Sequence, residues 1–422
     1  MNIKRVCAAA VLGSMIAAVP AMAEGKVYYL NFKPEADQAW QDLAAVYTEQ
    51  TGVEVKVVTA AAGTYDDTLT AEMDKSDAPT MFQIGNQGAV NSWGDYAVIL
   101  DDSDIVAEQV TDVYNQKNSD GETVSVGYCY ESYGIIVNKA LLKEAGYDVA
   151  DINNFETLKA AADDIHARAE ELGFDAFSSA GLDGSSSWRF SGHLANMPLY
   201  YQFRDGDVTE QPAEITDAYL DNFKAIWDLY ITDSATTGSD LLAATGDQSE
   251  AEFMSGKAVF YQNGTWEYNN LIAGGMNAED ITMIPIYCGV EGEEEAGLCS
   301  GTENCWAVNN EASDEDIQAT LDFMTWVVTS EEGTTMLAEQ FGATPFKSAK
   351  TPENVFLAAA QELEAAGKYT VTWAFNWTPA VDDWRAAVVD AMGQYTAGTG
   401  EWDAVVSAFV DGWAVQYAND HA

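Results

Sequence analysis

Four short segments of the sequence place aromatic residues beside amides, carboxylates or arginine. They read Tyr128-Cys129-Tyr130-Glu131, Trp188-Arg189, Asn263-Gly264-Thr265-Trp266 and Trp373-Ala374-Phe375-Asn376-Trp377. Aromatic rings stack on the apolar faces of pyranose rings, and planar polar side chains hold sugar hydroxyls in fixed directions. A hydroxyl without a partner in a closed site costs about 1–3 kcal/mol, so such a network also selects stereochemistry. The mixture favours a carbohydrate site, although any single tryptophan could equally belong to the core.

A turn is expected at Asn263-Gly264, because Asn-Gly is a turn signal. The run before it, Ala258 to Tyr261, is short and apolar. Trp266 follows the turn directly, which is a poor position for a core residue. We therefore expect its ring to face a ligand.

Residues typical of catalysis are scarce. The chain has three histidines, His166, His193 and His421, and only His193 follows one of the aromatic segments closely. It contains no G-x-S-x-G, H-E-x-x-H or P-loop motif, and no cysteine or histidine spacing typical of zinc. Carboxylate pairs among the 68 acidic residues single out no acid and nucleophile. We therefore expect a binding protein that uses no catalytic residue, metal or cofactor.

The first 23 residues have the pattern of a secretory signal peptide. Lys4 and Arg5 precede an apolar run, and Ala21-Met22-Ala23 forms an A-x-A cleavage site. The run is too short to span a membrane, and Cys7 precedes it, which is not the order of a lipid-attachment site. We expect a mature chain that begins near Glu24 and is exported to the periplasm or the outer face of the cytoplasmic membrane.

The exported chain is strongly acidic. The full sequence has 19 basic and 68 acidic residues, a net charge of −49, and loss of Lys4 and Arg5 leaves 17 basic residues and −51. Such a surface repels nucleic acid and anionic lipid, so neither is expected as a partner. A hydrophobic content of 47% supports a real core.

Four cysteines remain after cleavage, and an oxidising compartment permits disulfides between them. They are Cys129, Cys288, Cys299 and Cys305. Cys288 and Cys299 flank the acidic loop 291–295 and could bridge it, but buried free thiols are an equal expectation.

The exported chain begins with alternating strands and helices. Strands are expected at 27–30, 53–57 and 80–84, with helices around 40–47 and 65–75 between them, and Gly52 is placed to end the first helix. This order predicts a parallel sheet in an α/β domain, whose ligands lie at the carboxyl ends of the strands. Later in the chain, the spacing of apolar residues predicts a strand at 133–137 and helices that begin near 139 and 155. Ser313-x-x-Asp316 and Thr329-x-x-Glu332 predict two further helix starts.

Three segments resemble the extracellular solute-binding proteins of carbohydrate ABC importers, the family that includes maltose-binding protein. Residues 256–266, GKAVFYQNGTW, are similar to that family's G-K-A-A-M-x-x-x-G-x-W pattern. Residues 133–146, YGIIVNKALLKEAG, resemble its strand leading into a helix, and 323–345 resemble its "FLxFLxSxExQ…GxxP" stretch. The matches extend over nearly the whole exported chain, from about 28 to 398.

The resemblance implies an α/β fold of two lobes joined by a hinge, the type II periplasmic-binding-protein fold, with parallel-type sheets flanked by helices and a ligand cleft between the lobes. Residues 24–130 and 306–346 would form the N-terminal lobe, and 131–305 and 347–422 the C-terminal lobe. The hinge strands would lie near 128–132 and 304–307, where a bridge between Cys129 and Cys305 is conceivable.

The resemblance also assigns site residues. Trp266 matches a stacking tryptophan and Glu131 a hinge carboxylate that binds sugar hydroxyls, whereas Asn86 and Gln87 are amides where maltose binders carry charged ligands. Lys33 and Glu35 lie in the first strand-to-helix loop, which also contacts ligand in similar proteins. Trp373 and Trp377 match an aromatic group before the C-terminal helix, and Trp188, Arg189 and His193 are added from their residue types alone. The candidate ligand-binding residues are Glu35, Asn86, Gln87, Glu131, Trp188, Arg189, Asn263, Trp266, Trp373 and Trp377.

The function implied by the resemblance is that of the substrate-binding component of an ABC importer. It would act as a monomer, capture a mono- or oligosaccharide by hinge closure, and deliver it to the permease subunits in the membrane. Two alternatives stay open. Aromatic and acidic residues also bind organic cations such as polyamines or betaines, and an exported glycoside hydrolase would use two carboxylates.

Overall fold

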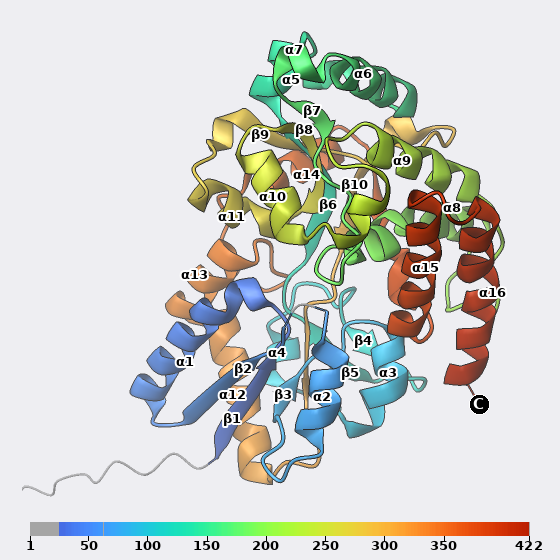
Figure 1. Cartoon of the computed structure of the whole chain (residues 1–422). Coiled ribbons are helices and arrows are strands. Elements are labelled where there is room, and N and C mark those ends of the chain that lie inside the picture. Colours follow the sequence, from blue (N-terminus) through green and yellow to red (C-terminus); the bar gives the residue numbers. More distant parts are fainter. Residues whose placement is uncertain (1–24, 62, 422) are drawn as a thin grey trace, which may run out of the picture.

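Two sheets, each with helices around it, make up the computed structural model, which describes residues 25–421 except residue 62 (Figure 1). The predicted signal peptide lies outside the described residues. The first sheet has the strand order β2 (Glu54–Thr59), β1 (Lys26–Asn31), β3 (Met81–Phe82), β11 (Cys305–Val308), β5 (Thr123–Gly127), β4 (Gln116–Lys117). The second has the order β12 (Tyr369–Thr372), β10 (Ala296–Gly301), β6 (Glu131–Asn138), β8 (Ala258–Gly264), β7 (Asp175–Phe177), with β9 (Ile281–Ile284) also paired to β6.

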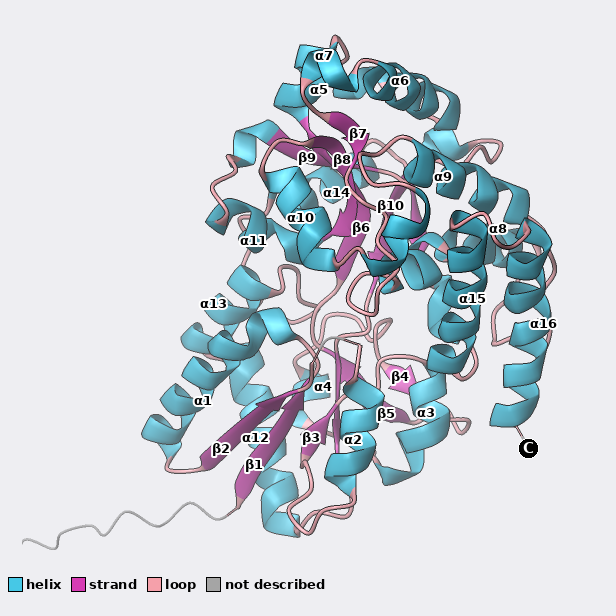
Figure 2. Cartoon of the chain, viewed as in Figure 1, coloured by secondary structure: helices cyan, strands magenta, loops and turns pink. Residues whose placement is uncertain are grey.

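Each sheet has its own group of helices and its own hydrophobic core, so the molecule has two lobes (Figure 2). The helices of the first lobe are α1 (Asp37–Thr51), α2 (Tyr65–Met73), α3 (Gln87–Trp93), α4 (Asp104–Ala107), α12 (Asp314–Thr329) and α13 (Glu331–Gln340). Those of the second are α5 (Lys139–Ala145), α6 (Phe155–Ala167), α7 (Ala169–Leu172), α8 (Asn196–Asp205), α9 (Leu220–Thr232), α10 (Gly246–Met254), α11 (Tyr268–Ala273), α14 (Val355–Ala365), α15 (Val381–Thr396) and α16 (Trp402–Asp420).

The predicted β-α-β-α-β start is confirmed. Helix α1 buries Trp40, Leu43, Ala44 and Tyr47 on one face, as the spacing predicts, and Gly52 ends it with a φ of +80°, a conformation that glycine adopts without strain. Strands β1, β2 and β3 pair in parallel. The parallel prediction does not extend to every pair, because β11 runs antiparallel to β3 and β5, and β6 runs antiparallel to β8, β9 and β10.

Two local predictions are wrong. Asn263-Gly264 is not a turn but the end of strand β8, where Asn263 pairs with Gly134 of β6, because strand pairing supplies the hydrogen bonds that a turn would have offered. The predicted start of the second helix is one residue too early. Ser330, rather than Thr329, caps α13 by accepting a hydrogen bond from the Gly333 amide. The cap at Ser313 is confirmed.

The chain crosses between the sheets at 128–130, at 302–304 and again between α13 and α14. The first two crossings contact each other, because the Tyr128 amide donates to the Asn304 carbonyl oxygen at 2.9 Å. The expected hinge strands, 128–132 and 304–307, overlap these crossings only in part, because 131–132 already belong to β6 and 305–307 to β11. The exact lobe boundaries, 24–130 with 306–346 and 131–305 with 347–422, stay a prediction.

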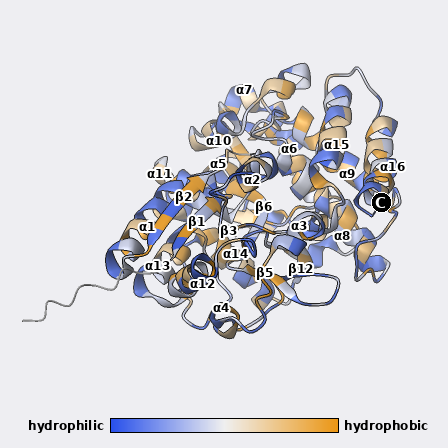
Figure 3. Ribbon diagram, turned by 90° about the horizontal axis from the view of Figure 1, so that it is seen from below, coloured by the Kyte–Doolittle hydropathy of each residue, from blue (hydrophilic) through white to orange (hydrophobic). Residues whose placement is uncertain are grey.

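The four cysteines among the described residues are buried free thiols, so neither of the two conceivable bridges is formed. Burial raises the pKa of Cys299 and of Cys305 to about 12. No helix within 25–421 combines the length and hydropathy that crossing a membrane requires. Hydrophobic and hydrophilic residues are mixed along the helices around the sheets (Figure 3), and the buried hydrophobic residues form the cores of the lobes.

Candidate ligand-binding site

Trp266 lies at the end of β8, where the second lobe meets the first. Its ring folds back over Gly264, so closely that a Cβ at Gly264 would overlap it. Lys33 of the first lobe holds its Nζ 5.3 Å from the centre of the ring. The indole is only partly buried. Strand β8 and a glycine therefore hold this ring at the boundary between the lobes.

A π-helix, Arg189–Leu194, follows Trp188 and is fully buried. Such helices are rare and are often found at functional sites. It places His193 directly above Tyr133 of β6, with stacked rings 4.2 Å apart. Arg385 of α15 lies against Gly192 in the same turn, and any side chain at that glycine would displace the guanidinium. The π-helix thus brings an imidazole into the aromatic surroundings of Trp266.

The resulting aromatic cluster draws on four separate parts of the second lobe. His193 is central, with ring centres 5.1 Å from Trp188, 5.3 Å from Trp266 and 5.8 Å from Trp373. Trp188 and Trp266 are 6.0 Å apart and keep exposed surface, whereas the others are buried. We refer to this set as the aromatic cluster: Tyr133, Trp188, His193, Trp266, Trp373 and Phe375.

Buried polar atoms without a hydrogen-bond partner among the described residues lie in and beside this cluster. They are His193 Nδ1, Trp373 Nε1, Asn376 Oδ1 and Thr378 Oγ1. Burial, together with the charges of Arg385, Lys33 and Arg189, lowers the pKa of His193 well below its usual value. Its imidazole is therefore neutral near pH 7, with one donor and one acceptor nitrogen. An unpaired buried polar group costs about 1–3 kcal/mol, so the set favours a ligand with hydroxyl groups.

A buried ion pair ties the hinge to the first lobe. Lys33 Nζ lies 2.9 Å from each oxygen of Glu131, and Asn304 Nδ2 donates to the same carboxylate at 2.6 Å. Burial by itself would lower the pKa of Lys33, but the carboxylates of Glu131 and Glu35 outweigh it and raise that pKa. Glu131 thus has three bonds within the protein, so its own hydrogen bonds hold the hinge together.

Carboxylates of opposite lobes approach one another in two places. Burial, and then the charges of Glu250 and Glu35, raises the pKa of Glu267 to about 7. Partial removal from water, and then the charge of Asp382 and a hydrogen bond to it, raises the pKa of Asp66 to about 7. Asp66 belongs to α2 and Asp382 to α15, and both residues keep contact with solvent. Burial is the largest cause in both cases, and charges from the other lobe, Glu35 for Glu267 and Asp382 for Asp66, add to it.

The structure brings together three of the candidate residues, Trp188, Trp266 and Trp373, in the aromatic cluster. Glu131 lies nearby at the hinge, and Glu35 approaches it through Lys33, whose Nζ is 3.5 Å from the Glu35 carboxylate. Asn86 caps α3 through its side-chain oxygen and donates to Glu303 at 3.3 Å. Trp188, Trp266, Trp373, Glu35 and Asn86 remain candidates for ligand contact, whereas the buried Glu131 carboxylate is already bound by Lys33 and Asn304.

Two further candidates are buried and make their hydrogen bonds inside the protein, although Arg189 Nε has no hydrogen-bond partner among the described residues. Asn263 is buried, and its Nδ2 donates to the Tyr261 hydroxyl at 2.7 Å and to Glu267 at 2.9 Å. Arg189 is 2% exposed and donates to the carbonyl oxygens of Ser179 and Gln262, among others. Their burial favours a supporting role, which the residue types alone did not reveal.

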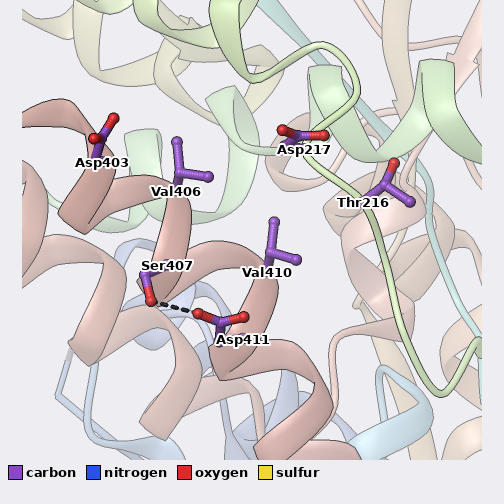
Figure 4. Close-up of a pocket in the computed structure, with 7 residues that line it drawn as sticks. All are labelled: Thr216, Asp217, Asp403, Val406, Ser407, Val410 and Asp411. Atoms are coloured by element: carbon purple, nitrogen blue, oxygen red, sulfur yellow. Dashed lines mark hydrogen bonds between the residues drawn. The ribbon is translucent and has the colours of Figure 1, made fainter.

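Gln87 and Trp377 lie apart from the aromatic cluster. Both line a pocket of about 420 Å³ between α3 and the end of α16. Another pocket, of about 320 Å³, lies between α16 and residues 216–217, entirely within the second lobe (Figure 4). Three aspartates and two valines line most of it, and no aromatic residue does, so it lacks the features of a sugar site.

Sequence reasoning missed the acidic pair Asp66 and Asp382 and the C-terminal aromatic residues of the interlobe pocket, Tyr417 and His421. Asp66 directly follows the strand-end loop 60–65, which is a usable signal for ligand proximity. Nothing local marks Asp382, Tyr417 or His421, because their neighbours come from the other lobe. Within 25–421, leaving out residue 62, no group of three metal-ligating side chains is found.

Comparison with known proteins agrees with this architecture. The chain belongs to the bacterial extracellular solute-binding proteins, whose family model matches residues 42–365. A comparison with curated proteins finds no match.

Solved structures with a similar fold include three sugar-related binding proteins. One is RafE in complex with raffinose, with 16% identity, a TM-score of 0.73, and coverage of 94% of this chain and 100% of that one. A chitin oligosaccharide binding protein shows 16% identity, a TM-score of 0.73, and 93% and 100% coverage. The GacH receptor of Streptomyces glaucescens, solved with acarbose, shows 18% identity, a TM-score of 0.69, and 94% and 99% coverage. At these identities the likeness establishes the two-lobe α/β fold.

Proposed function

We propose that this protein is the exported sugar-binding component of an ABC importer. The observation that carries the proposal is the aromatic cluster at the lobe boundary, in which two partly exposed indoles adjoin unpaired buried polar atoms. Pyranose rings offer one apolar face for Trp188 or Trp266 and several hydroxyls for the neighbouring polar atoms. The sugar ligands named for the similar structures support the same class of ligand.

The mechanism follows from which lobe contributes each residue. The aromatic cluster belongs to the second lobe, whereas Lys33, Glu35 and Asn86 belong to the first. A ligand that contacts both sets stabilises the closed form only by the affinity difference between closed and open forms. A micromolar dissociation constant corresponds to about −8 kcal/mol, which a few hydroxyl networks and one or two stacking contacts can supply. The closed protein would then deliver the sugar to permease subunits in the membrane.

The organic-cation alternative is less well supported. The cationic group nearest Trp266 is already the protein's own Lys33, 5.3 Å from the ring centre. A ligand cation would have to displace this ammonium from a carboxylate that holds it at 2.9 Å. The salt dependence of ligand affinity distinguishes the two functions, because cation binding weakens steeply with ionic strength and neutral sugar binding does not. For a glycoside hydrolase, no observation singles out an acid and a nucleophile.

The experiment is titration calorimetry of the exported chain, residues 24–422, after a thermal-shift screen of sugars, polyamines and betaines. A ligand that binds only the folded form raises the melting temperature. Trp266→Ala should weaken binding of the sugar found by at least about tenfold, or about 1.4 kcal/mol. Trp93→Ala, which changes a partly exposed tryptophan of α3, is the matched control and should bind normally. Wild-type affinity in Trp266→Ala, or shifts with cations alone, would overturn the proposal.

A further inference from the structure

The arginines among the described residues fall into two groups. Arg168 and Arg204 keep contact with solvent and form ion pairs with nearby aspartates. Arg189 and Arg385 form no ion pair within the part of the chain that the structure describes, although the sequence has 68 acidic and only 19 basic residues. Both of these unpaired arginines adjoin the aromatic cluster.

Arg385 holds its guanidinium at the edge of the aromatic cluster. Its Cζ lies 5.4 Å from the centre of the Phe375 ring, and that ring centre is 5.4 Å from the centre of the His193 ring. A side chain at Gly192 would meet Arg385 Nη2 at 2.9 Å, so this glycine leaves room for the guanidinium. No hydrogen bond of this group is found within 25–421, leaving out residue 62, and the side chain is only partly buried. Its five N–H donors are therefore free to bind a ligand at the cluster.

Arg189 adds a second positive charge beside the cluster. It is 2% exposed, and its hydrogen bonds go to uncharged oxygens of Ser179, Ser186, Ser249 and Gln262. Its Nε has no hydrogen-bond partner among the described residues. A buried cation without a paired anion is costly, so an anionic group bound nearby would stabilise this arginine.

The charges that act on His193, at the centre of the cluster, are all positive. Burial, and then the charges of Arg385, Lys33 and Arg189, lower the pKa of this imidazole. Lys33 is balanced by the Glu131 carboxylate at 2.9 Å, so the excess charge comes from the two arginines. The centre of the cluster is therefore a positive region in a strongly acidic protein.

Acidic groups near Arg385 do not neutralise it by contact. Burial, and then Asp382 and Glu303, raise the pKa of Asp66 to about 7 although the charge of Arg385 opposes the shift, so Asp66 is partly protonated at neutral pH. Asp382 is exposed to water, and Glu303 accepts a hydrogen bond from Asn86 at 3.3 Å. Charges farther away on the acidic surface are screened over about 8–10 Å at physiological salt. The guanidinium therefore remains available to an anionic ligand.

We propose that the sugar bound at the aromatic cluster is acidic, and that its carboxylate binds the Arg385 guanidinium. A uronic acid combines a pyranose ring, which the indoles stack against, with a planar carboxylate that the guanidinium fork binds through two parallel hydrogen bonds. A carboxylate carries one charge and a phosphate ester about two, so one free guanidinium suits a carboxylate. This inference rests on the proposed function and narrows its ligand to a sugar acid.

The test is titration calorimetry of the exported chain with ligands that differ in charge. Glucuronate and galacturonate, alone and in disaccharides, are compared with the corresponding neutral sugars and with glucuronamide and galacturonamide, in which an amide replaces the carboxylate. The uronate should bind at least about tenfold more tightly than its neutral counterparts, the discrimination expected from one charged hydrogen bond. Glucose 6-phosphate should bind more weakly than that uronate.

Arg385→Gln should lower affinity for the uronate by at least about tenfold and leave affinity for a neutral counterpart within about twofold. Arg385→Lys keeps the charge without the fork and should lose less. Arg204→Gln, which changes an exposed arginine of the same lobe, is the matched control and should keep the wild-type preference for the uronate. Equal losses for the uronate and its neutral counterpart in Arg385→Gln would indicate a purely structural role and overturn the proposal. Unchanged uronate affinity would overturn it as well.

The same titrations separate this proposal from the sugar-binding function. If only neutral sugars bind, and Arg385→Gln leaves their affinity unchanged, the sugar-binding function stands and the acidic ligand is wrong. Tighter binding of glucose 6-phosphate than of every uronate would overturn the carboxylate in favour of a phosphate. If no sugar of either kind binds to folded protein, both proposals fail.

Discussion

Lys33 and Glu131 form a buried ion pair, with Nζ 2.9 Å from both carboxylate oxygens, although they lie 98 positions apart in the chain. Lys33 follows β1 of the first lobe, and Glu131 begins β6 of the second. Asn304 of the second crossing donates to the same carboxylate. One carboxylate thus joins the first lobe to two of the segments that connect the lobes.

Breaking this pair should destabilise the fold strongly. Lys33→Met leaves the Glu131 carboxylate buried without its cation, which costs about 3–5 kcal/mol of unfolding free energy. The double variant Lys33→Met/Glu131→Gln removes both charges and should recover more than half of that loss. Urea unfolding of the singles and the double measures the coupling. Additive losses would show that the two side chains do not act as a pair.

Lobe closure should weaken as the pH rises through about 7. Burial, and then the charge of Asp382 and a hydrogen bond to it, raises the pKa of Asp66 from 3.8 to about 7. When the lobes separate, the contribution of Asp382 is lost and the Asp66 carboxyl group releases its proton at a lower pH. The approach of Asp66 to Asp382 in the closed form is therefore favoured below a pH of about 7. Above that pH both carboxylates are charged and repel each other, which opposes closure. Because both residues contact solvent, the effect on ligand affinity should be a few-fold at most.

Ligand affinity measured at about pH 5.5 and about pH 8.5, on either side of the raised pKa, tests this expectation. Asp382→Asn should remove that part of the pH dependence, whereas Asp383→Asn, an exposed neighbour on α15, should leave it. A pH profile unchanged by Asp382→Asn would contradict the role of the pair.

Gly264→Ala should displace the Trp266 ring without removing it. The added Cβ would overlap the ring, whose partly exposed position lets it move while β8 stays paired. We expect a loss of sugar affinity of about tenfold, like that of Trp266→Ala, with a native circular dichroism spectrum. Gly184→Ala, where a Cβ meets no atom within 4 Å, is the control. Wild-type affinity in Gly264→Ala would mean that the ring position is unimportant.

The buried thiols should resist modification until the protein unfolds. Burial raises the pKa of all four cysteines of the exported chain, so little thiolate forms at neutral pH. Titration with Ellman's reagent should find no reactive thiol in the native protein and four after denaturation. Two or fewer after denaturation would show that disulfides form in the exported protein.

The sequence by itself determined the local elements and the class of site. The period of Trp40, Leu43, Ala44 and Tyr47 defined the buried face of α1, and Gly52 its end, because helix formation depends on residues three or four positions apart. The aromatic segments likewise contained four members of the cluster: Trp188, Trp266, Trp373 and Phe375. Local signals failed at Asn263-Gly264, where pairing with β6 took precedence over turn propensity.

Only the tertiary structure decided which side chains meet. The ion pair of Lys33 with Glu131, the approach of Asp66 to Asp382 and the pocket between α3 and α16 each join residues from different lobes. Arg189 is buried because of the π-helix and the strands beneath it. This burial favours a supporting role for its side chain over direct contact with a ligand. Such contacts follow from sheet register and lobe packing, which no short stretch of sequence specifies.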